Sequence, residues 1–230
     1  MRHRSFALMM FAAGFGTRMG ALTADRPKPL IPVAGRALID HALALADDAG
    51  FTRIAVNLHY RGDMIRAHLA GRDIAFSEET PDILETGGGL RAALPLLGPG
   101  PVATLNTDAV WTGANPLVTL AHHWRADMGA LLLLAPLART TGHRGKGDFS
   151  LHSDGRISRG GPLVYLGAQI VDPTGLGSFG DHAFSLNRHW DALIAQGRAF
   201  GALHPGLWCD VGRPDGIGLA EAMLQGTGNV

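Results

Sequence analysis

A short stretch near the N-terminus, "FAAGFGTRMGALTADRPKPL", contains three glycines together with threonine, arginine and lysine side chains directly after an apolar run. Gly14 and Gly16 allow backbone N–H groups to approach an anion closely, and Thr17 adds a hydroxyl. Arg18 and Lys28 supply positive charge. These residue types suit a nucleoside triphosphate. The residues alone leave one alternative open, a tight turn whose charges are solvated.

Two familiar phosphate-binding patterns do not fit this stretch. Met19 stands where a dinucleotide fingerprint needs its third glycine, and Pro27, Pro29 and Pro32 prevent the long helix that should follow. The Gly-Lys-Ser/Thr ending of a Walker loop is missing. The sequence therefore predicts an extended, proline-stiffened loop at the end of a strand.

Two carboxylates far apart in the sequence each follow an apolar segment. Asp108 comes just after "VATLN", and Asp210 lies in "LWCDVG". If the two converge they can hold Mg²⁺, which binds through few carboxylates and completes its shell with water and phosphate oxygens. In the alternative interpretation, Asp108 caps a turn and Asp210 pairs with a surface arginine.

The elements that must position these groups follow from an alternation of apolar runs and helical patterns in the first half of the chain. We expect strands within 6–13, 53–58, 74–77 and 102–106, and helices within 37–50, 62–70 and 88–97. Gly50 is expected to end the first of these helices. The pattern predicts an α/β fold with a parallel sheet between helices.

The rhythm changes after Asp108. We expect a helix at 116–125, a strand at 130–137, a polar Gly-rich segment, short strands near 157 and at 163–171, and helices within 184–197 and 217–226. Mixed strand directions are expected here, in a smaller subregion beside the sheet. No linker divides the chain, so residues 1–230 are expected to form a single domain.

Composition narrows the possible partners. The chain has 230 residues, with 20 basic and 20 acidic side chains, so no overall charge favours nucleic acid or an anionic membrane surface. The single cysteine, Cys209, excludes an intramolecular disulfide framework and fits a reducing compartment.

The N-terminus imitates a secretory signal, because Arg2 and Arg4 precede an apolar stretch. No convincing cleavage site comes before Arg18, and no run reaches the ~18 apolar residues that a membrane span needs. We expect a cytoplasmic protein.

Five motifs occur together in order: "AAGFGTRMGALTADRPKPLIPVAGRALIDHAL", "LETGGGLRAALPLLG", "LNTDAVW", "GKGDF" and "WCDVGRP". Over most of its length the chain thus resembles the sugar-1-phosphate nucleotidyltransferases, most closely the branch of N-acetylmuramate-1-phosphate uridylyltransferases of peptidoglycan recycling. This resemblance implies a Rossmann-like, mostly parallel sheet of the nucleotide-diphospho-sugar transferase type with a small sugar-binding subregion. It also implies Mg²⁺-dependent transfer of a uridylyl group from UTP to N-acetylmuramic acid 1-phosphate, which forms UDP-N-acetylmuramic acid and pyrophosphate.

The resemblance assigns roles to individual residues. Arg18, Lys28 and Asp108 are expected to be catalytic, with Asp108 and Asp210 as the Mg²⁺ ligands. The residues expected to bind the nucleotide are Ala12, Ala13, Gly14, Gly16, Thr17, Lys28, Gly87, Gly88 and Asn106. For the glycines of "LETGGG", the alternative is a plain helix N-terminus.

On the acceptor side, Asp148, Gly167 and Asn187 are expected to contact the sugar, and Phe149 to hold its loop in the core. The cations between residues 139 and 146 are candidates for a lactyl carboxylate. The chain departs from the family pattern at Asn187, where a lysine is expected. Two alternatives therefore stay open. The acceptor could be another hexose 1-phosphate, used with UTP or GTP, or the protein could be a non-catalytic sensor of nucleotide sugars.

Overall fold

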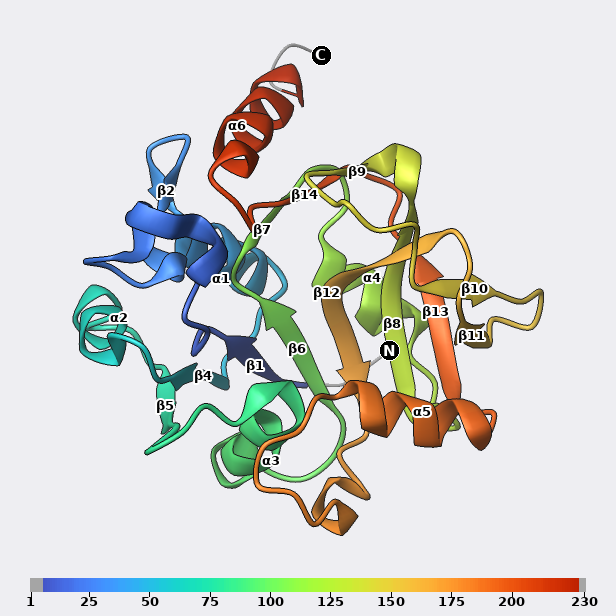
Figure 1. The fold of residues 1–230 in the computed structure, drawn as a ribbon. Coiled ribbons are helices and arrows are strands. Elements are labelled where there is room, and N and C mark those ends of the chain that lie inside the picture. The colour runs from blue at the N-terminus through green and yellow to red at the C-terminus, as the bar shows by residue number, and fades with distance from the viewer. Residues whose placement is uncertain (1–5, 228–230) are drawn as a thin grey trace.

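The computed structural model describes residues 6–227 and contains one large sheet between helices (Figure 1). Within this range the sheet has nine strands, and its main body follows the order β5-β4-β1-β6-β12-β8-β13. The bounds are β1 Ala7–Phe11, β4 Ile54–Leu58, β5 Ala75–Glu78, β6 Val102–Asn106, β8 Ala130–Pro136, β12 Leu163–Val171 and β13 Ala199–Leu203. The predicted α/β class is confirmed.

The first half of the chain builds the parallel side of the sheet. Strands β1, β4, β5 and β6 run in one direction, with Met10 beside both Val56 and Leu105. The connecting helices are α1 Leu38–Asp48, α2 Gly62–His68 and α3 Glu85–Leu97. Gly50 follows α1 with a φ of 74°, as expected of a residue that ends a helix. The carboxyl ends of the four strands therefore share one edge.

The second half mixes strand directions, as predicted. β12 runs antiparallel to β6, β8 and the short strand β10 (Phe149–Leu151), whereas β13 is parallel to β8. Strand β13 was not predicted, because it is short and carries Gly201 in its middle, and a strand interior disfavours glycine. Its backbone hydrogen bonds to β8 stabilise this strand, although its own sequence shows no strand pattern.

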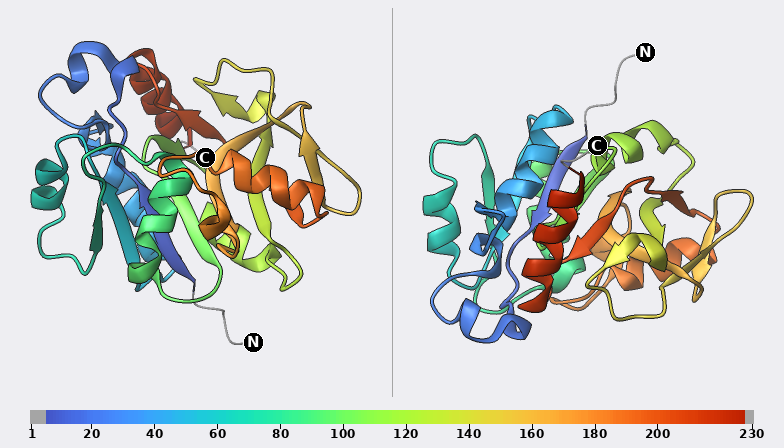
Figure 2. Two further views of the ribbon diagram at one scale, coloured as in Figure 1. Left: turned by 60° about the horizontal axis from the view of Figure 1, so that its bottom comes forward. Right: turned by 90° about the horizontal axis from the view of Figure 1, so that it is seen from above.

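Helices cover both faces of the sheet, giving three layers (Figure 2). Along β1, Leu8 and Met10 pack into the core beneath α1, α2 and α4 (Pro116–His123), whereas Met9 packs into the core beneath α3 and α5 (Asn187–Ala195). This alternation follows from the two-residue period of a strand. A strand with both faces buried reads as a continuous apolar run, and "ALMMF" is such a run.

The remaining elements are short strands and the last helix. They are β2 Pro32–Val33, β3 Arg36–Ala37, β7 Ala109–Trp111, β9 Thr140–Thr141, β10 Phe149–Leu151, β11 Ile157–Arg159, β14 Trp208–Asp210 and α6 Asp215–Thr227. Strands β10 and β11 complete the nine-stranded sheet, and β7, β14 and β9, like β2 and β3, form small sheets of their own. A third core joins Met19 of the Gly-rich loop to Val110 of β7, Cys209 of β14 and Ala220 of α6. The C-terminal elements thereby hold the N-terminal loop in place.

The apolar stretch that imitates a secretory signal forms β1, and Leu8, Met9 and Met10 are fully buried there. Arg2 and Arg4 lie outside the described residues. Between residues 6 and 227, none of the helices has the length and apolar character needed to cross a membrane.

Candidate active site

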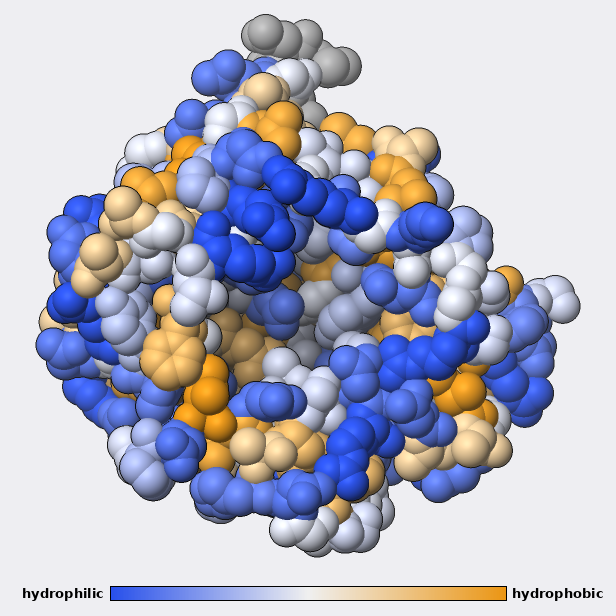
Figure 3. All heavy atoms as spheres, in the orientation of Figure 1, coloured by the Kyte–Doolittle hydropathy of each residue, from blue (hydrophilic) through white to orange (hydrophobic). Residues whose placement is uncertain are grey.

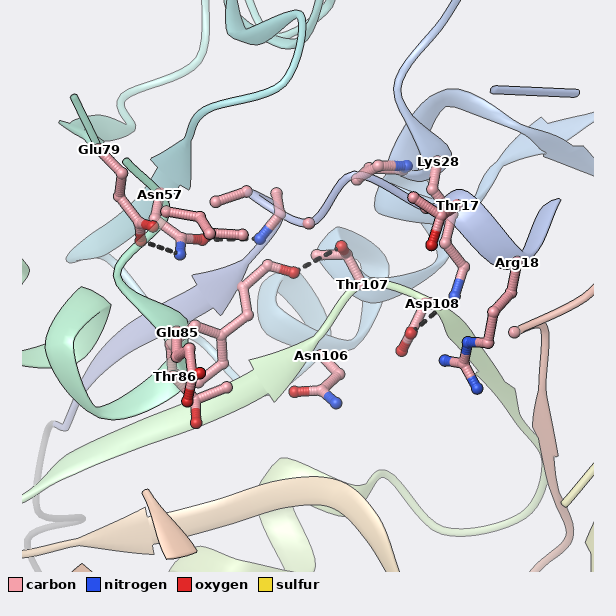
Figure 4. Close-up of a pocket in the computed structure, with 18 residues that line it drawn as sticks. Thr17, Arg18, Lys28, Asn57, Glu79, Glu85, Thr86, Asn106, Thr107 and Asp108 are labelled. Atoms are coloured by element: carbon pink, nitrogen blue, oxygen red, sulfur yellow. Dashed lines mark hydrogen bonds and ion pairs between the residues drawn. The ribbon is translucent and has the colours of Figure 1, made fainter. Parts of the chain in front are cut away.

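A cavity opens at the carboxyl ends of β1 and β6, where the face in Figure 3 is hollowed near its centre. It contains about 860 Å³ including its open mouth, a size typical of small-molecule sites. The carboxyl edge of parallel strands is also where α/β sheets bind ligands. The predicted residues that line this first cavity are Ala12, Ala13, Gly14, Gly16, Thr17, Arg18, Lys28, Asn106 and Asp108 (Figure 4).

The sequence predicted an extended Gly-rich loop, and this prediction was wrong. The loop winds into 3₁₀ turns over Thr17–Thr23, with a kink at Gly20, and over Lys28–Leu30, which follows Pro27. Gly16, with a φ of 65°, lies so close to Lys28 that a Cβ there would be 2.9 Å from the lysine Cβ. The prolines therefore punctuate the loop, and the glycine lets its two ends pack together.

Lys28 and Asp108 form an ion pair on the cavity wall. The Lys28 ammonium donates to Asp108 Oδ2 at 2.8 Å, across 80 positions of sequence. The lysine side chain is only 9% exposed, and the aspartate side chain is 32% exposed. A buried lysine needs such a partner, because an unpaired charge is costly to remove from water. The pair places one fixed cation and one partly open carboxylate side by side.

Asp210 lies next to this pair because β14 and β7 are neighbouring antiparallel strands. Asp210 is opposite Ala109 in the register, and the Val211 N–H donates to the Asp108 carbonyl at 2.9 Å. Burial, and then the charge of Asp108, raise the pKa of Asp210, while Lys28 and Arg18 oppose the shift. Two carboxylates that repel each other in a partly buried setting suit a divalent cation.

A buried network at the other end of the first cavity was not predicted. Glu79 is fully buried, and its carboxylate accepts from Asn57 Nδ2 at 2.6 Å and from the Leu84 N–H at 2.7 Å. Asn57 Oδ1 accepts in turn from the Ala12 N–H at 2.7 Å. The network ties the end of β1 to the segment before α3. Its members lie in unremarkable strand sequences, and only the pairing of β4 with β5 brings them together.

Gly87 and Gly88 were expected to contact the nucleotide, but Glu85 and Thr86 line the first cavity in their place. Both glycine N–H groups donate to the Phe184 carbonyl, at 2.8 and 3.1 Å. A Cβ on Gly87 would lie 2.4 Å from the Phe184 ring. The absence of side chains at these glycines therefore lets α3 pack closely against the Phe184 segment.

A second cavity adjoins the first and shares Phe11, Thr86 and Asn106 with it. It contains about 670 Å³ including its mouth. The predicted acceptor residues Asp148 and Asn187 both line it. Other lining residues are Phe149, Arg159, Tyr165, Gln169, Ser185, Leu186 and Trp190. The two cavities thus form one continuous depression with a common wall.

Polar groups of the second cavity are held in fixed positions. Asp148 Oδ2 accepts from the Tyr165 N–H at 2.8 Å, and its Oδ1 has no partner among residues 6–227, so it can accept from a ligand. Gln169 is fully buried, and its Oε1 accepts from Trp190 Nε1 at 2.8 Å, while its amide nitrogen has no partner among the described residues. Phe149 is 1% exposed and packs against Trp190, as predicted for a residue that holds its loop down.

Gly167 lies behind the cavity wall. With a φ of 78°, it packs against Asn106, so that a Cβ would come 2.9 Å from the amide nitrogen. Its place in β12 positions Asn106 on the wall that the cavities share. None of the cations of the 139–146 segment lines the second cavity. Arg139 donates to the Pro205 carbonyl, Arg144 pairs with Asp215 at 2.9 Å, and His143 lies near Asp210.

Comparison with known proteins agrees with this geometry. The family model of the MobA-like NTP transferase domain matches residues 9–203. The chain is 42% identical to an N-acetylmuramate alpha-1-phosphate uridylyltransferase of Caulobacter vibrioides, over 94% of this chain and 96% of that protein. It is 35% identical to the protein of the same name from Neisseria meningitidis, over 94% and 96%.

Solved structures share the fold at lower identity. HddC from Yersinia pseudotuberculosis, complexed with GMP-PN, superposes with a TM-score of 0.76 at 17% identity, over 95% of this chain and 99% of that one. A putative glucose-1-phosphate thymidylyltransferase from Bacillus anthracis gives 0.76 at 16% identity, over 94% of both chains. The chain therefore belongs to the MobA-like NTP transferase family, and it is a sugar-1-phosphate nucleotidyltransferase related to the N-acetylmuramate alpha-1-phosphate uridylyltransferases.

Proposed function

We propose that the protein transfers a uridylyl group from UTP to N-acetylmuramic acid 1-phosphate in the cytoplasm. A phosphate oxygen of the sugar 1-phosphate attacks the α-phosphorus of UTP, the bond to the β-phosphate breaks, and pyrophosphate leaves as UDP-N-acetylmuramic acid forms. The observation that carries this proposal is the Lys28–Asp108 pair, which lies on the wall of the first cavity with Asp210 next to it, while the second cavity adjoins the first.

The attacking phosphate oxygen is already ionised near neutral pH, so the reaction needs no general base. Catalysis then consists of alignment and charge neutralisation. Lys28 lies where it would meet the α-phosphate, and Arg18, in the same cavity, would steady the departing β- and γ-phosphates. The backbone N–H groups from Ala13 to Thr17 would complete the phosphate site.

Asp108 and Asp210 are the residues that would hold Mg²⁺. They are two neighbouring oxygen-donor groups, and the charge of Asp108 contributes to the raised pKa of Asp210. When bound, the ion supplies charge neutralisation between the reacting phosphates.

The acceptor would occupy the second cavity. Asp148 presents a carboxylate oxygen that can accept from two sugar hydroxyls, and Asn187 lies at the start of α5 on the same wall. The segment Glu85–Thr86 lines the first cavity, where its backbone groups would face the base.

A substrate panel scored by pyrophosphate release tests the proposal. UTP, GTP and the other nucleoside triphosphates are each paired with the 1-phosphates of N-acetylmuramic acid, N-acetylglucosamine and glucose. We expect UTP with N-acetylmuramic acid 1-phosphate to give the highest kcat/KM. Preference for another pair contradicts the assignment, and nucleotide binding without turnover of any pair indicates a sensor.

A further inference from the structure

We propose that Arg159 selects the acceptor by binding the carboxylate of its lactyl ether. This inference rests on the proposed function, because that carboxylate is what distinguishes N-acetylmuramic acid 1-phosphate from N-acetylglucosamine 1-phosphate. A carboxylate that is removed from water needs a cation or several hydrogen-bond donors as partners. An acceptor cavity that binds the lactyl carboxylate must therefore supply such a partner.

The charges on the wall of the second cavity identify the candidate. Asp148 is the anion of this wall, and Arg159 is the cation among its described lining residues. Tyr165 carries no charge there, since burial raises its pKa above its usual range. The arginine is thus the group that can meet a carboxylate within the cavity.

The hairpin register explains why Arg159 lies beside Asp148. Strands β10 and β11 pair so that Phe149 is opposite Arg159, and Asp148 directly precedes Phe149. The same hairpin places the site's anion and cation on adjacent positions of the wall. A carboxylate that accepts sugar hydroxyls and a guanidinium that binds an acid group can then contact different parts of one sugar.

The guanidinium is held in place and still has free donors. It lies over the rings of Phe149 and Trp190, at 4.9 and 5.6 Å from their centroids. Its Nε donates to Asp191 at 2.7 Å, and one Nη donates to the Asn187 carbonyl at 3.0 Å. The other Nη has no acceptor among residues 6–227, so it remains available to a ligand. A planar, oriented guanidinium is well suited to a carboxylate.

Arg159 is itself paired with Asp191, and what separates it from the other described cations of the subregion is that none of those lines the second cavity. Arg144 is paired with Asp215 on the surface, and Arg139 donates to a backbone carbonyl. Arg156 precedes Arg159 on the same hairpin but pairs with Asp154 and does not line the cavity. Arg156 is therefore a matched control, being a half-exposed, ion-paired arginine three residues away.

The test measures kcat/KM at saturating UTP for the two 1-phosphates that differ only in the lactyl group. Arg159→Gln keeps a polar side chain over the two rings. We expect it to lower kcat/KM for N-acetylmuramic acid 1-phosphate by about 10- to 100-fold, mainly through KM, the scale of one charge-assisted hydrogen bond. The value for N-acetylglucosamine 1-phosphate should stay within about twofold. Arg159→Lys should recover part of the loss, and Arg156→Gln should behave as the wild type.

The outcomes separate this inference from the proposed function. If the wild type prefers N-acetylmuramic acid 1-phosphate and Arg159→Gln lowers both acceptors equally, the guanidinium serves a part that they share, such as the phosphate, and this inference alone is overturned. If the wild type does not prefer that acceptor, the acceptor assignment is overturned and the inference with it. Thermal melts of both variants show whether any loss comes from unfolding.

Discussion

The Lys28 side chain has two roles, because its stem is packed in the Gly-rich loop and its charge faces the cavity. Its stem packs against Gly16 and is almost fully buried, while its ammonium is paired with Asp108 at the cavity wall. A lysine so enclosed has little freedom left to lose when a phosphate arrives, which favours alignment. The same enclosure means that removing the whole side chain disturbs the loop as well as the charge.

We therefore expect different stability effects from the two cations. Lys28→Met keeps the stem and removes the charge, and Arg18→Ala removes a side chain that lines the open cavity. Each should lower kcat/KM for the triphosphate by roughly two to three powers of ten. Melting without ligand should stay close to wild type for Arg18→Ala. A protein that melts early but keeps its activity would show that this loop has only a structural role.

Asp108→Ala and Asp210→Ala should each reduce turnover at least about a hundredfold at ordinary Mg²⁺ concentration. Without metal, Asp210→Ala should melt no lower than the wild type, because the substitution removes one of two like charges in a partly buried position. Asp215→Ala, at an exposed ion pair, is the control. Ordinary activity in either cavity variant contradicts the metal assignment.

Prediction from the sequence worked best for residues inside a motif. Gly14, Arg18, Lys28 and Asp108, for which the sequence predicts roles in the reaction, line one cavity because the motifs that contain them follow the ends of strands. Arg159 was missed, because it reaches the second cavity only through a hairpin whose register the sequence does not reveal.

At the scale of elements, the packing of α3 on the segment before α5 depends on the absence of side chains. Gly87→Ala should destabilise the protein by about 1–3 kcal/mol, because the added methyl meets the Phe184 ring and carbonyl. Gly218→Ala is the control, since Gly218 lies in α6 with nothing within 4 Å of its would-be Cβ. That variant should gain about 0.5–1 kcal/mol from helix propensity. Equal effects in chemical denaturation would contradict this view of the glycine.

The alternating elements of the first half were predicted because the helices carry apolar residues at helical spacing and the buried strands are short apolar runs. α1 and β4 are examples, with apolar residues at helical spacing followed by a short apolar run. The failures are of another kind. β13 and the 3₁₀ segments of the Gly-rich loop depend on partners distant in sequence, namely β8 and the third core.

At the scale of the whole molecule, stability should depend on pH through buried histidines. Burial lowers the pKa of His204, which lies at 5.2 Å from the Trp111 ring and contacts the Thr112 carbonyl through Nε2. The unfolded chain then binds the proton more readily than the fold does, so the stability present above pH ~6.5 is lost as pH falls below it. His189 shifts in the same direction for the same reason.

Melting temperatures at pH 7.5 and 5.5 check this expectation. The drop should be smaller in His204→Gln than in the wild type, whereas the exposed His152→Gln should show the full drop. An unchanged drop in His204→Gln would mean that other groups govern the acid sensitivity.

The reversed direction of β12 bears on how this enzyme can change its acceptor over evolutionary time. Because β12 is inserted between β6 and β8, the wall that carries Tyr165 and Gln169 is the middle of a hydrogen-bonded strand. Insertions and deletions, which loops tolerate readily, would here shift the register and turn side chains to the wrong face. New acceptor ranges should therefore arise by single substitutions on a constant backbone, and laboratory evolution of this cavity should enrich point changes in β12 and β11 over changes in chain length.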